Sequence, residues 1–297
     1  MARDGLSGLA LPGEAELQSF ARAVAQLLEV RSARHAGARV VRRRPGVGLQ
    51  HLDHRDYQPG DELRHVDWRQ TARHGRPVLR QFEAEASGDW TLLLDASSSM
   101  TTHDSGKWRA ACRAAAGLAY ALLAGGARVR VLGIAERVLG EVGAGRGAAQ
   151  YAAIARMLQA TSPEPDGRRC DLAAAAVRLR GEGASVVLGD LLGAQEMRPA
   201  LRALRERCSR LHVLRIVDTH DLELLDSAPA ELVDVETGER RAIDPATALP
   251  AARLADRGAA ERLRAFCRES GLVFSEWRIT APWQSALLEH LLAARAS

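Results

Sequence analysis

The chain has 297 residues, of which 46% are hydrophobic and 26% are charged, sufficient for a full-sized core in one domain or one domain with an appendage. The net charge of +4 is too small to indicate a nucleic-acid partner, and no apolar stretch is long enough for direct membrane insertion. The four cysteines form no CxxC pair, which argues against a zinc site or a disulfide framework and favours reduced thiols in the cytoplasm.

Residues 1–37 are predicted to form an N-terminal helical segment. Apolar side chains recur at helical spacing over residues 13–30. The following run, residues 31–44, contains six arginines and no acid. Such a run is typical of a solvated linker or an edge strand, and the alternative is a patch for an acidic partner surface, phosphate or anionic lipid.

Residues 38–88 have a different character. Short β-like pieces at residues 39–41 and 78–80 are separated by many prolines and glycines. This pattern favours an irregular, β-rich element that precedes the main domain.

Residues 89–297 alternate between continuous apolar strands and helices, which is typical of a parallel sheet covered on both faces. Near residues 230–244 the alternation is interrupted by a hairpin signature with Thr-Gly at its turn. We therefore expect an α/β fold with a doubly wound, mostly parallel sheet in the order 3-2-1-4-5. Strands are expected at 90–94, 127–135, 137–142, 184–188, 211–217 and 272–277, and helices at 107–123, 148–158, 172–179, 199–208, 253–270 and 283–294.

The first strand of this region ends in polar side chains, namely Asp95, Ser97 and Ser99. In open α/β sheets, ligands bind beyond the carboxyl ends of the strands, where the strand order reverses. Asp95 is therefore expected on the floor of that crevice, with the two serine hydroxyls above it. Carboxylate and hydroxyl oxygens are hard ligands suited to Mg²⁺ or Mn²⁺.

A second acid, Asp190, is expected beside the first. It follows the strand at residues 184–188, which lies next to the first strand in the expected order. One carboxylate and two neutral hydroxyls cannot neutralise a divalent ion, so Asp190 completes the predicted metal site. Its remaining coordination positions would accept a carboxylate from another protein. The alternative is that Asp95 and the serines only cap the helix that follows them, and that Asp190 likewise caps the next helix.

Two motifs resemble those of known families. Residues 95–99, Asp-Ala-Ser-Ser-Ser, resemble the metal-ion-dependent adhesion site of von Willebrand factor A domains. The longer run at residues 57–73, YQPGDELRHVDWRQTAR, resembles the signature of the bacterial domain of unknown function 58. Residues 82–85 and 234–238 resemble further pieces of it, so the resemblance covers most of the chain from about Gly46.

The resemblance implies a partner and a function. Members of this family resemble partners of MoxR-type AAA+ ATPases, in chaperone-like systems that assemble or activate a client complex. The chain has no GxxxxGK[ST] phosphate loop, so ATP hydrolysis would come from that partner. We therefore expect a non-enzymatic protein-binding module whose client has an exposed Asp or Glu.

One position departs from the family pattern. The adhesion sites of the family supply a threonine hydroxyl from a loop, and the matching position here is Cys170. A thiol is a poor ligand for Mg²⁺. Three possibilities stay open: Asp171 helps instead, the ion is held weakly, or the site binds no ion and acts as a plain surface.

The upstream signature mixes acids, arginines and aromatic side chains at close spacing. One interpretation is an ion-pair network that ties the β-rich element to the main domain, since a buried charge must be paired. The other is a partner-docking surface. The residues concerned are Tyr57, Asp61, Arg64, Asp67, Trp68 and Arg73. Nearby His51, Asp53 and His54 lack a fourth ligand at useful spacing, which favours lone surface histidines.

Two other functions are alternatives. A metal-dependent hydrolase would use Asp95 and Asp190, with His103 as the base nearest in sequence, but the chain has no GxSxG nucleophile elbow. Nucleic-acid binding through the arginine run would give an affinity that depends steeply on salt. The scarcity of aromatic residues near that run argues against the stacking of bases.

Overall fold

The computed structural model describes residues 9–36, 51–56, 71, 78–82, 89–163, 169–179, 183–191, 194–222, 230–234 and 239–296. The chain divides into two compact units, one of Met1–Val30 with Ser87–Ser297 and one of Arg31–Ala86. In the second unit, β1 (His51–Asp56) and β2 (Val78–Phe82) pair in antiparallel fashion.

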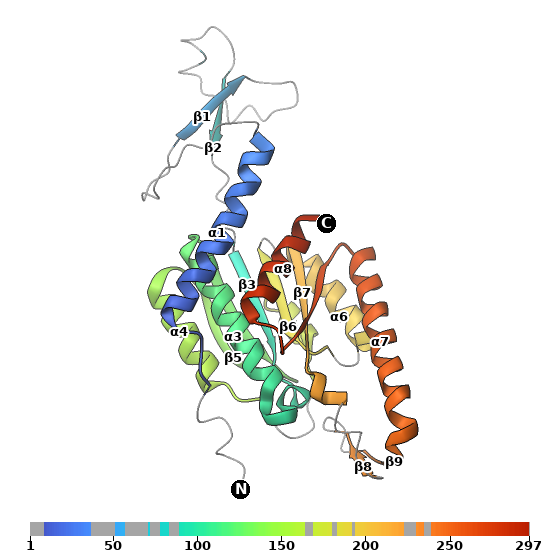
Figure 1. The fold of residues 1–297 in the computed structure, drawn as a ribbon. Coiled ribbons are helices and arrows are strands. Elements are labelled where there is room, and N and C mark those ends of the chain that lie inside the picture. The colour runs from blue at the N-terminus through green and yellow to red at the C-terminus, as the bar shows by residue number, and fades with distance from the viewer. Residues whose placement is uncertain are drawn as a thin grey trace. The chain divides into compact units, whose positions relative to one another are not determined.

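The first unit is built on a six-stranded sheet in the order β10-β7-β6-β3-β4-β5 (Figure 1). All neighbouring strands run parallel except β4 and β5, which are antiparallel. The predicted order 3-2-1-4-5 is confirmed, with the last strand added at the edge. The strands are β3 (Asp89–Asp95), β4 (Arg128–Ile134), β5 (Val138–Gly145), β6 (Ala184–Gly189), β7 (Arg210–Val217) and β10 (Val273–Arg278).

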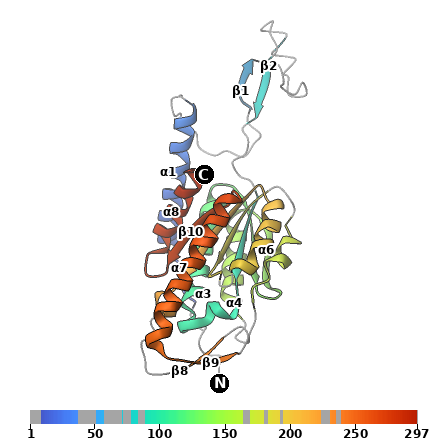
Figure 2. The same cartoon turned by 90° about the vertical axis from the view of Figure 1, so that its right-hand side faces the viewer.

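Helices cover both faces of this sheet (Figures 1 and 2). Alternate residues of each strand point to opposite sides, so Leu92 and Leu94 of β3 pack into one hydrophobic core and Leu93 into the other. The doubly wound α/β fold is thus confirmed. One face bears α1 (Glu14–Ala36), α3 (Thr102–Ala124), α4 (Gly147–Ala160) and α8 (Trp283–Ala296), and the other bears α5 (Leu172–Ala176), α6 (Ala194–Glu206) and α7 (Pro245–Glu269).

Short elements connect this framework. A 3₁₀ turn, η2 (Ser98–Thr101), follows β3, and a second, η3 (Thr219–Leu222), follows β7. Strands β8 (Ala230–Val233) and β9 (Arg240–Ile243) form an antiparallel hairpin, while its Thr-Gly turn lies outside the described residues. Within the described part of the chain, no helix is both long and apolar enough to cross a membrane.

Candidate functional site

The carboxyl end of β3 gathers three oxygen-bearing side chains. Asp95 Oδ1 accepts hydrogen bonds from Ser97 N at 2.9 Å and from Ser97 Oγ at 2.6 Å. Ser97 Oγ in turn lies 3.0 Å from Ser99 Oγ. An aspartate that binds the backbone two residues ahead is a common way to start a turn. All three side chains are buried, so β3 ends in an enclosed polar cluster rather than in solvent.

The second carboxylate oxygen of Asp95, Oδ2, differs from Oδ1 in its hydrogen bonding. Oδ2 is buried and has no hydrogen-bond partner among the described residues. It lies against Gly189 at the end of β6, where a Cβ atom would be only 2.8 Å from it. A buried carboxylate oxygen without a partner is unfavourable while the group is ionised.

Asp190 directly follows Gly189 and is 3% exposed. It lies close enough to Asp95 to affect that group electrostatically. The pKa of Asp95 is raised from 3.8 to about 7, first because burial removes water from the carboxylate and second because Asp190 repels its charge. The hydrogen bonds from Ser97 oppose this rise in the pKa, and so does the nearby thiol of Cys170. The structure therefore brings together the predicted set of Asp95, Ser97, Ser99 and Asp190.

The two residues left open by the sequence have different positions. The thiol of Cys170 faces the carboxylate of Asp95, and burial together with that carboxylate raises the thiol pKa well above its usual range. Asp171 instead caps α5, accepting hydrogen bonds from Ala173 N at 2.9 Å and Ala174 N at 3.3 Å. Of the two, only the neutral thiol of Cys170 is part of the polar cluster.

Two residues of the cluster were not predicted as site residues. Lys107 Nζ lies 3.0 Å from Asp190 Oδ2 and 2.8 Å from Asp221 Oδ2, with the lysine side chain 1% exposed. Burial lowers the lysine pKa, but Asp190 and Asp221 outweigh that effect and raise it, so the group stays an ammonium ion. The sequence held a signal for Lys107, which is the only lysine in the chain. It held none for Asp221, which reaches the cluster from η3.

The backbone around Asp190 is held from the opposite side by Arg215 of β7. Its Nε donates to the carbonyl oxygen of Asp190 at 3.2 Å, and its other nitrogens pair with Glu276 and Asp256. Leu191, the next residue, has a φ of 52°. Left-handed backbone at a residue other than glycine costs about 1 kcal/mol or more and is often found at functional sites.

The cluster fits a divalent ion in its chemistry. Its donors are hard oxygens, and the carboxylates of Asp95, Asp190 and Asp221 with the ammonium of Lys107 leave a formal charge of −2 when all are ionised. No group of three His, Cys, Asp or Glu side chains suited to a metal occurs in the described ranges. An ion at this site would therefore also need the serine hydroxyls as donors. The residues that would hold the ion are Asp95, Ser97 and Ser99, with Asp190 beside them.

Other predicted residues are not placed. The signature residues Tyr57, Asp61, Arg64, Asp67, Trp68 and Arg73 lie outside the described residues. His51, Asp53 and His54 belong to β1, and His103 belongs to the first turn of α3. The side chains of these four residues also lie outside the described part, so the docking surface and the hydrolase base stay predictions.

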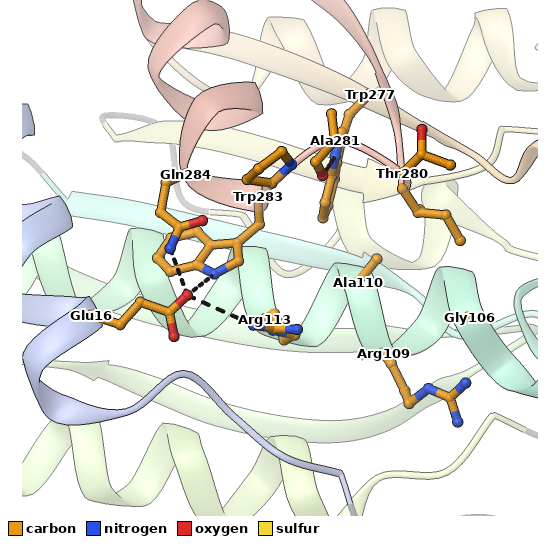
Figure 3. A pocket seen from close by; sticks show the side chains of 12 residues that line it. Glu16, Gly106, Arg109, Ala110, Arg113, Trp277, Thr280, Ala281, Trp283 and Gln284 are labelled. Atoms are coloured by element: carbon orange, nitrogen blue, oxygen red, sulfur yellow. Dashed lines mark hydrogen bonds and ion pairs between the residues drawn. The ribbon is translucent and has the colours of Figure 1, made fainter.

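A separate pocket of about 540 Å³ lies between α1, α3 and the start of α8 (Figure 3). None of the predicted site residues lines it. Glu16 of α1 closes one side, where its Oε1 accepts hydrogen bonds from Trp283 Nε1 at 2.7 Å and Gln284 Nε2 at 2.5 Å. These hydrogen bonds hold α1 against α8.

Comparison with known proteins identifies the family. The family model described as "Protein of unknown function DUF58" matches residues 53–264, a range that includes the whole polar cluster. Two relatives, "Uncharacterized protein Rv1480" of Mycobacterium tuberculosis (strain ATCC 25618 / H37Rv) and "Uncharacterized protein Mb1516" of Mycobacterium bovis (strain ATCC BAA-935 / AF2122/97), are each 31% identical over 259 residues. The alignments cover 84% of this chain and 81% of each relative. The family predicted from residues 57–73 is thereby confirmed, and the chain belongs to the DUF58 family of proteins of unknown function.

Proposed function

We propose that the chain is a non-enzymatic binding module that holds another protein through a metal-ion-dependent adhesion site at Asp95, Ser97 and Ser99. One observation supports this most directly. Asp95 Oδ2 is buried without a hydrogen-bond partner in the described part of the chain, while Oδ1 binds Ser97, and Asp190 repels the charge of the carboxylate. A bound cation relieves both unfavourable features of this carboxylate.

Each side chain of the cluster has a distinct part in binding. Ser97 fixes the orientation of Asp95 through its two hydrogen bonds to Oδ1, which leaves the buried Oδ2 as the oxygen without a hydrogen bond from the described residues. Asp95, Ser97 and Ser99 would hold Mg²⁺ or Mn²⁺, which would supply a Lewis-acidic position for an Asp or Glu of the bound protein, the ATPase or the client.

We further propose that the module works in the cytoplasm with a MoxR-type AAA+ ATPase in the assembly or activation of a client complex. The ATPase partner rests on the family resemblance, and the chain has no phosphate loop with which to bind ATP in the same manner. All four cysteines are free thiols, as is usual in a reducing compartment.

The test is direct binding to the purified MoxR-type ATPase from the same organism, measured with Mg²⁺ and again with EDTA. Asp95→Asn removes the charge but keeps the shape of the side chain. We expect it to weaken binding at least roughly tenfold, a loss of about 1.4 kcal/mol, and to abolish the effect of EDTA.

The matched control is Asp89→Asn at the other end of β3. Asp89 is exposed and pairs with Arg128 at 3.1 Å, so it receives the same substitution away from the cluster. Its binding is expected to equal that of the unmodified chain. Full binding by a folded Asp95→Asn variant, or equal binding in EDTA, would overturn the adhesion-site function.

A further inference from the structure

Lys107 is an unusual residue in this chain. The sequence has 41 lysines and arginines together, and Lys107 is the only lysine among them. Arginine presents a broad planar fork, whereas lysine ends in a compact point charge. All the remaining lysine-or-arginine positions of the chain are arginine, and the single lysine lies inside the candidate site.

The surroundings of Lys107 resemble those of a bound cation. Its side chain is 1% exposed, so the ammonium group is withdrawn from water. Two carboxylates from separate segments converge on it, Asp190 after β6 at 3.0 Å and Asp221 in η3 at 2.8 Å. A buried ammonium ion is tolerated only with such partners, so these three residues depend on one another.

Asp190 interacts with two charged groups at once, the ammonium group of Lys107 and the carboxylate of Asp95. Its Oδ2 binds Lys107, and its charge also repels Asp95 across the ends of β3 and β6. A divalent ion near Asp95 would be attracted to Asp190 and repelled by the ammonium group held on the same acid. Charges a few ångströms apart in a buried site interact strongly enough to change an ion affinity by a factor of roughly ten or more.

We propose that Lys107 is a resident cation of the adhesion site, which holds Asp190 and Asp221 and competes with the divalent ion for their negative charge. This inference rests on the proposed function for the identity of the ion. Lys107 acts as a positioning residue and sets a low ion affinity, so the site fills completely only when a partner supplies a further carboxylate. Ion binding and partner binding are in this way made dependent on each other.

The test measures the affinity for Mn²⁺ alone, by electron paramagnetic resonance of the free ion, for four forms of the full chain. These are the unmodified chain, Lys107→Met, Asp95→Asn and the double variant. Lys107→Met keeps an unbranched side chain only one atom shorter and removes its charge. We expect it to bind Mn²⁺ at least roughly tenfold more tightly than the unmodified chain and to lose this binding when Asp95 is also replaced.

The recovery of stability by Mn²⁺ gives a second readout that the replacement of a purely structural lysine would not produce. Lys107→Met leaves two carboxylates without their cation, so the variant should unfold at a lower temperature in EDTA. Mn²⁺ should restore much of this loss in Lys107→Met and little in the double variant.

Because Lys107 is the only lysine, the unmodified chain labelled with ¹⁵N-lysine gives one side-chain signal, and we expect Mg²⁺ to shift it.

The outcomes separate the two proposals. Equal Mn²⁺ affinity in the unmodified chain and in Lys107→Met, both dependent on Asp95, overturns the role of Lys107 and leaves the adhesion site intact. Binding only in Lys107→Met supports the resident cation and argues against an ion-dependent function of the unmodified chain. If Lys107→Met does not fold even with Mn²⁺ present, the ¹⁵N signal decides at a Mg²⁺ concentration that saturates the Asp95-dependent site of the unmodified chain: an unshifted signal at saturation overturns the inference, and a shifted signal supports it.

Discussion

Gly189 lies so close to Asp95 that no side chain fits between them. A Cβ atom at residue 189 would lie 2.4 Å from Asp95 Cβ and 2.8 Å from Asp95 Oδ2, both shorter than any normal contact. The two residues face each other because β3 and β6 are parallel neighbours whose last aligned pair is Leu94 and Leu188. The absence of a side chain at Gly189 is therefore what allows the carboxylate of Asp95 to occupy the end of the sheet.

We predict that Gly189→Ala displaces Asp95 and disrupts the adhesion site. The added methyl group overlaps the aspartate side chain, so either the carboxylate rotates away or the strand ends separate. Overpacking of this kind costs about 1–3 kcal/mol of unfolding free energy. We expect that loss in urea unfolding, together with loss of Mn²⁺ binding measured by titration.

Gly143→Ala is the control for this substitution. Gly143 lies in β5 of the same sheet, and a Cβ atom there would meet nothing within 4 Å. This variant should keep both its stability and its Mn²⁺ binding. Unchanged Mn²⁺ binding in Gly189→Ala would show that the position of Asp95 does not matter for the ion.

A second prediction concerns the attachment of α1. Glu16 Oε1 accepts hydrogen bonds from Trp283 and Gln284 of α8 and lies 3.7 Å from Arg113 Nη2 of α3 (Figure 3). Glu16→Ala leaves the N–H of the buried Trp283 indole without its acceptor, at a cost of about 1–3 kcal/mol. We expect faster amide hydrogen exchange over residues 14–27 of α1, with α3 and β3 unaffected.

Glu14→Ala is the matched control in the same helical turn. Glu14 is exposed and its carboxylate binds only Gln18 of its own helix among the contacts of the described residues, at 3.0 Å. Exchange in α1 should then stay close to that of the unmodified chain. Equal effects of the two substitutions would mean that charge in the first turn, rather than the contact with Trp283, stabilises α1.

The fold was predictable because its signal is local. Leu92, Leu93 and Leu94 are all buried, because helices cover both sides of β3. A strand buried on both faces needs apolar residues at consecutive positions, and this run is visible in the sequence. Helix ends were less accurate. α7 begins at Pro245 rather than near residue 253, because proline is compatible with the first turn of a helix, where its missing N–H has no partner to lose.

A site residue was predictable only if it lies close to the others in the sequence or if the predicted strand order places it beside them. Asp95, Ser97 and Ser99 lie within one turn, and Asp190 follows a strand whose place beside β3 could be predicted. Asp221 reaches the cluster through a 3₁₀ turn after β7, a path for which the sequence has no periodic signal. Tertiary packing alone makes it a partner of the cluster.

A last prediction concerns two buried histidines, His212 of β7 and His290 of α8. Strand β7 lies next to β10, at the other end of the strand order from β5. His212 Nδ1 lies 3.1 Å from His290 Nε2, and Ser275 Oγ lies 2.5 Å from His290 Nδ1. Burial lowers the pKa of both imidazoles from 6.5, to about 3 for His212 and about 4 for His290, and the neighbouring His290 adds to the effect on His212. Both rings are therefore neutral in the folded chain near neutral pH.

Unfolding frees these rings to take up protons below about pH 6.5. Their contribution to stability is thus fully present above that pH and decreases as the pH falls toward 4, by about 1.4 kcal/mol per pH unit for each histidine. His212→Leu removes one of the two groups. Between pH 8 and pH 5, the unmodified chain should lose about 2 kcal/mol more unfolding free energy than this variant.

Urea unfolding of both proteins at the two pH values gives the comparison. The difference between the proteins isolates His212, because Asp95 and other groups with shifted pKa values are common to both and their effects cancel. Identical losses in the two proteins would mean that His212 already carries a proton in the folded chain at pH 5. In that case the ring pair would share a proton across its 3.1 Å contact instead of excluding it.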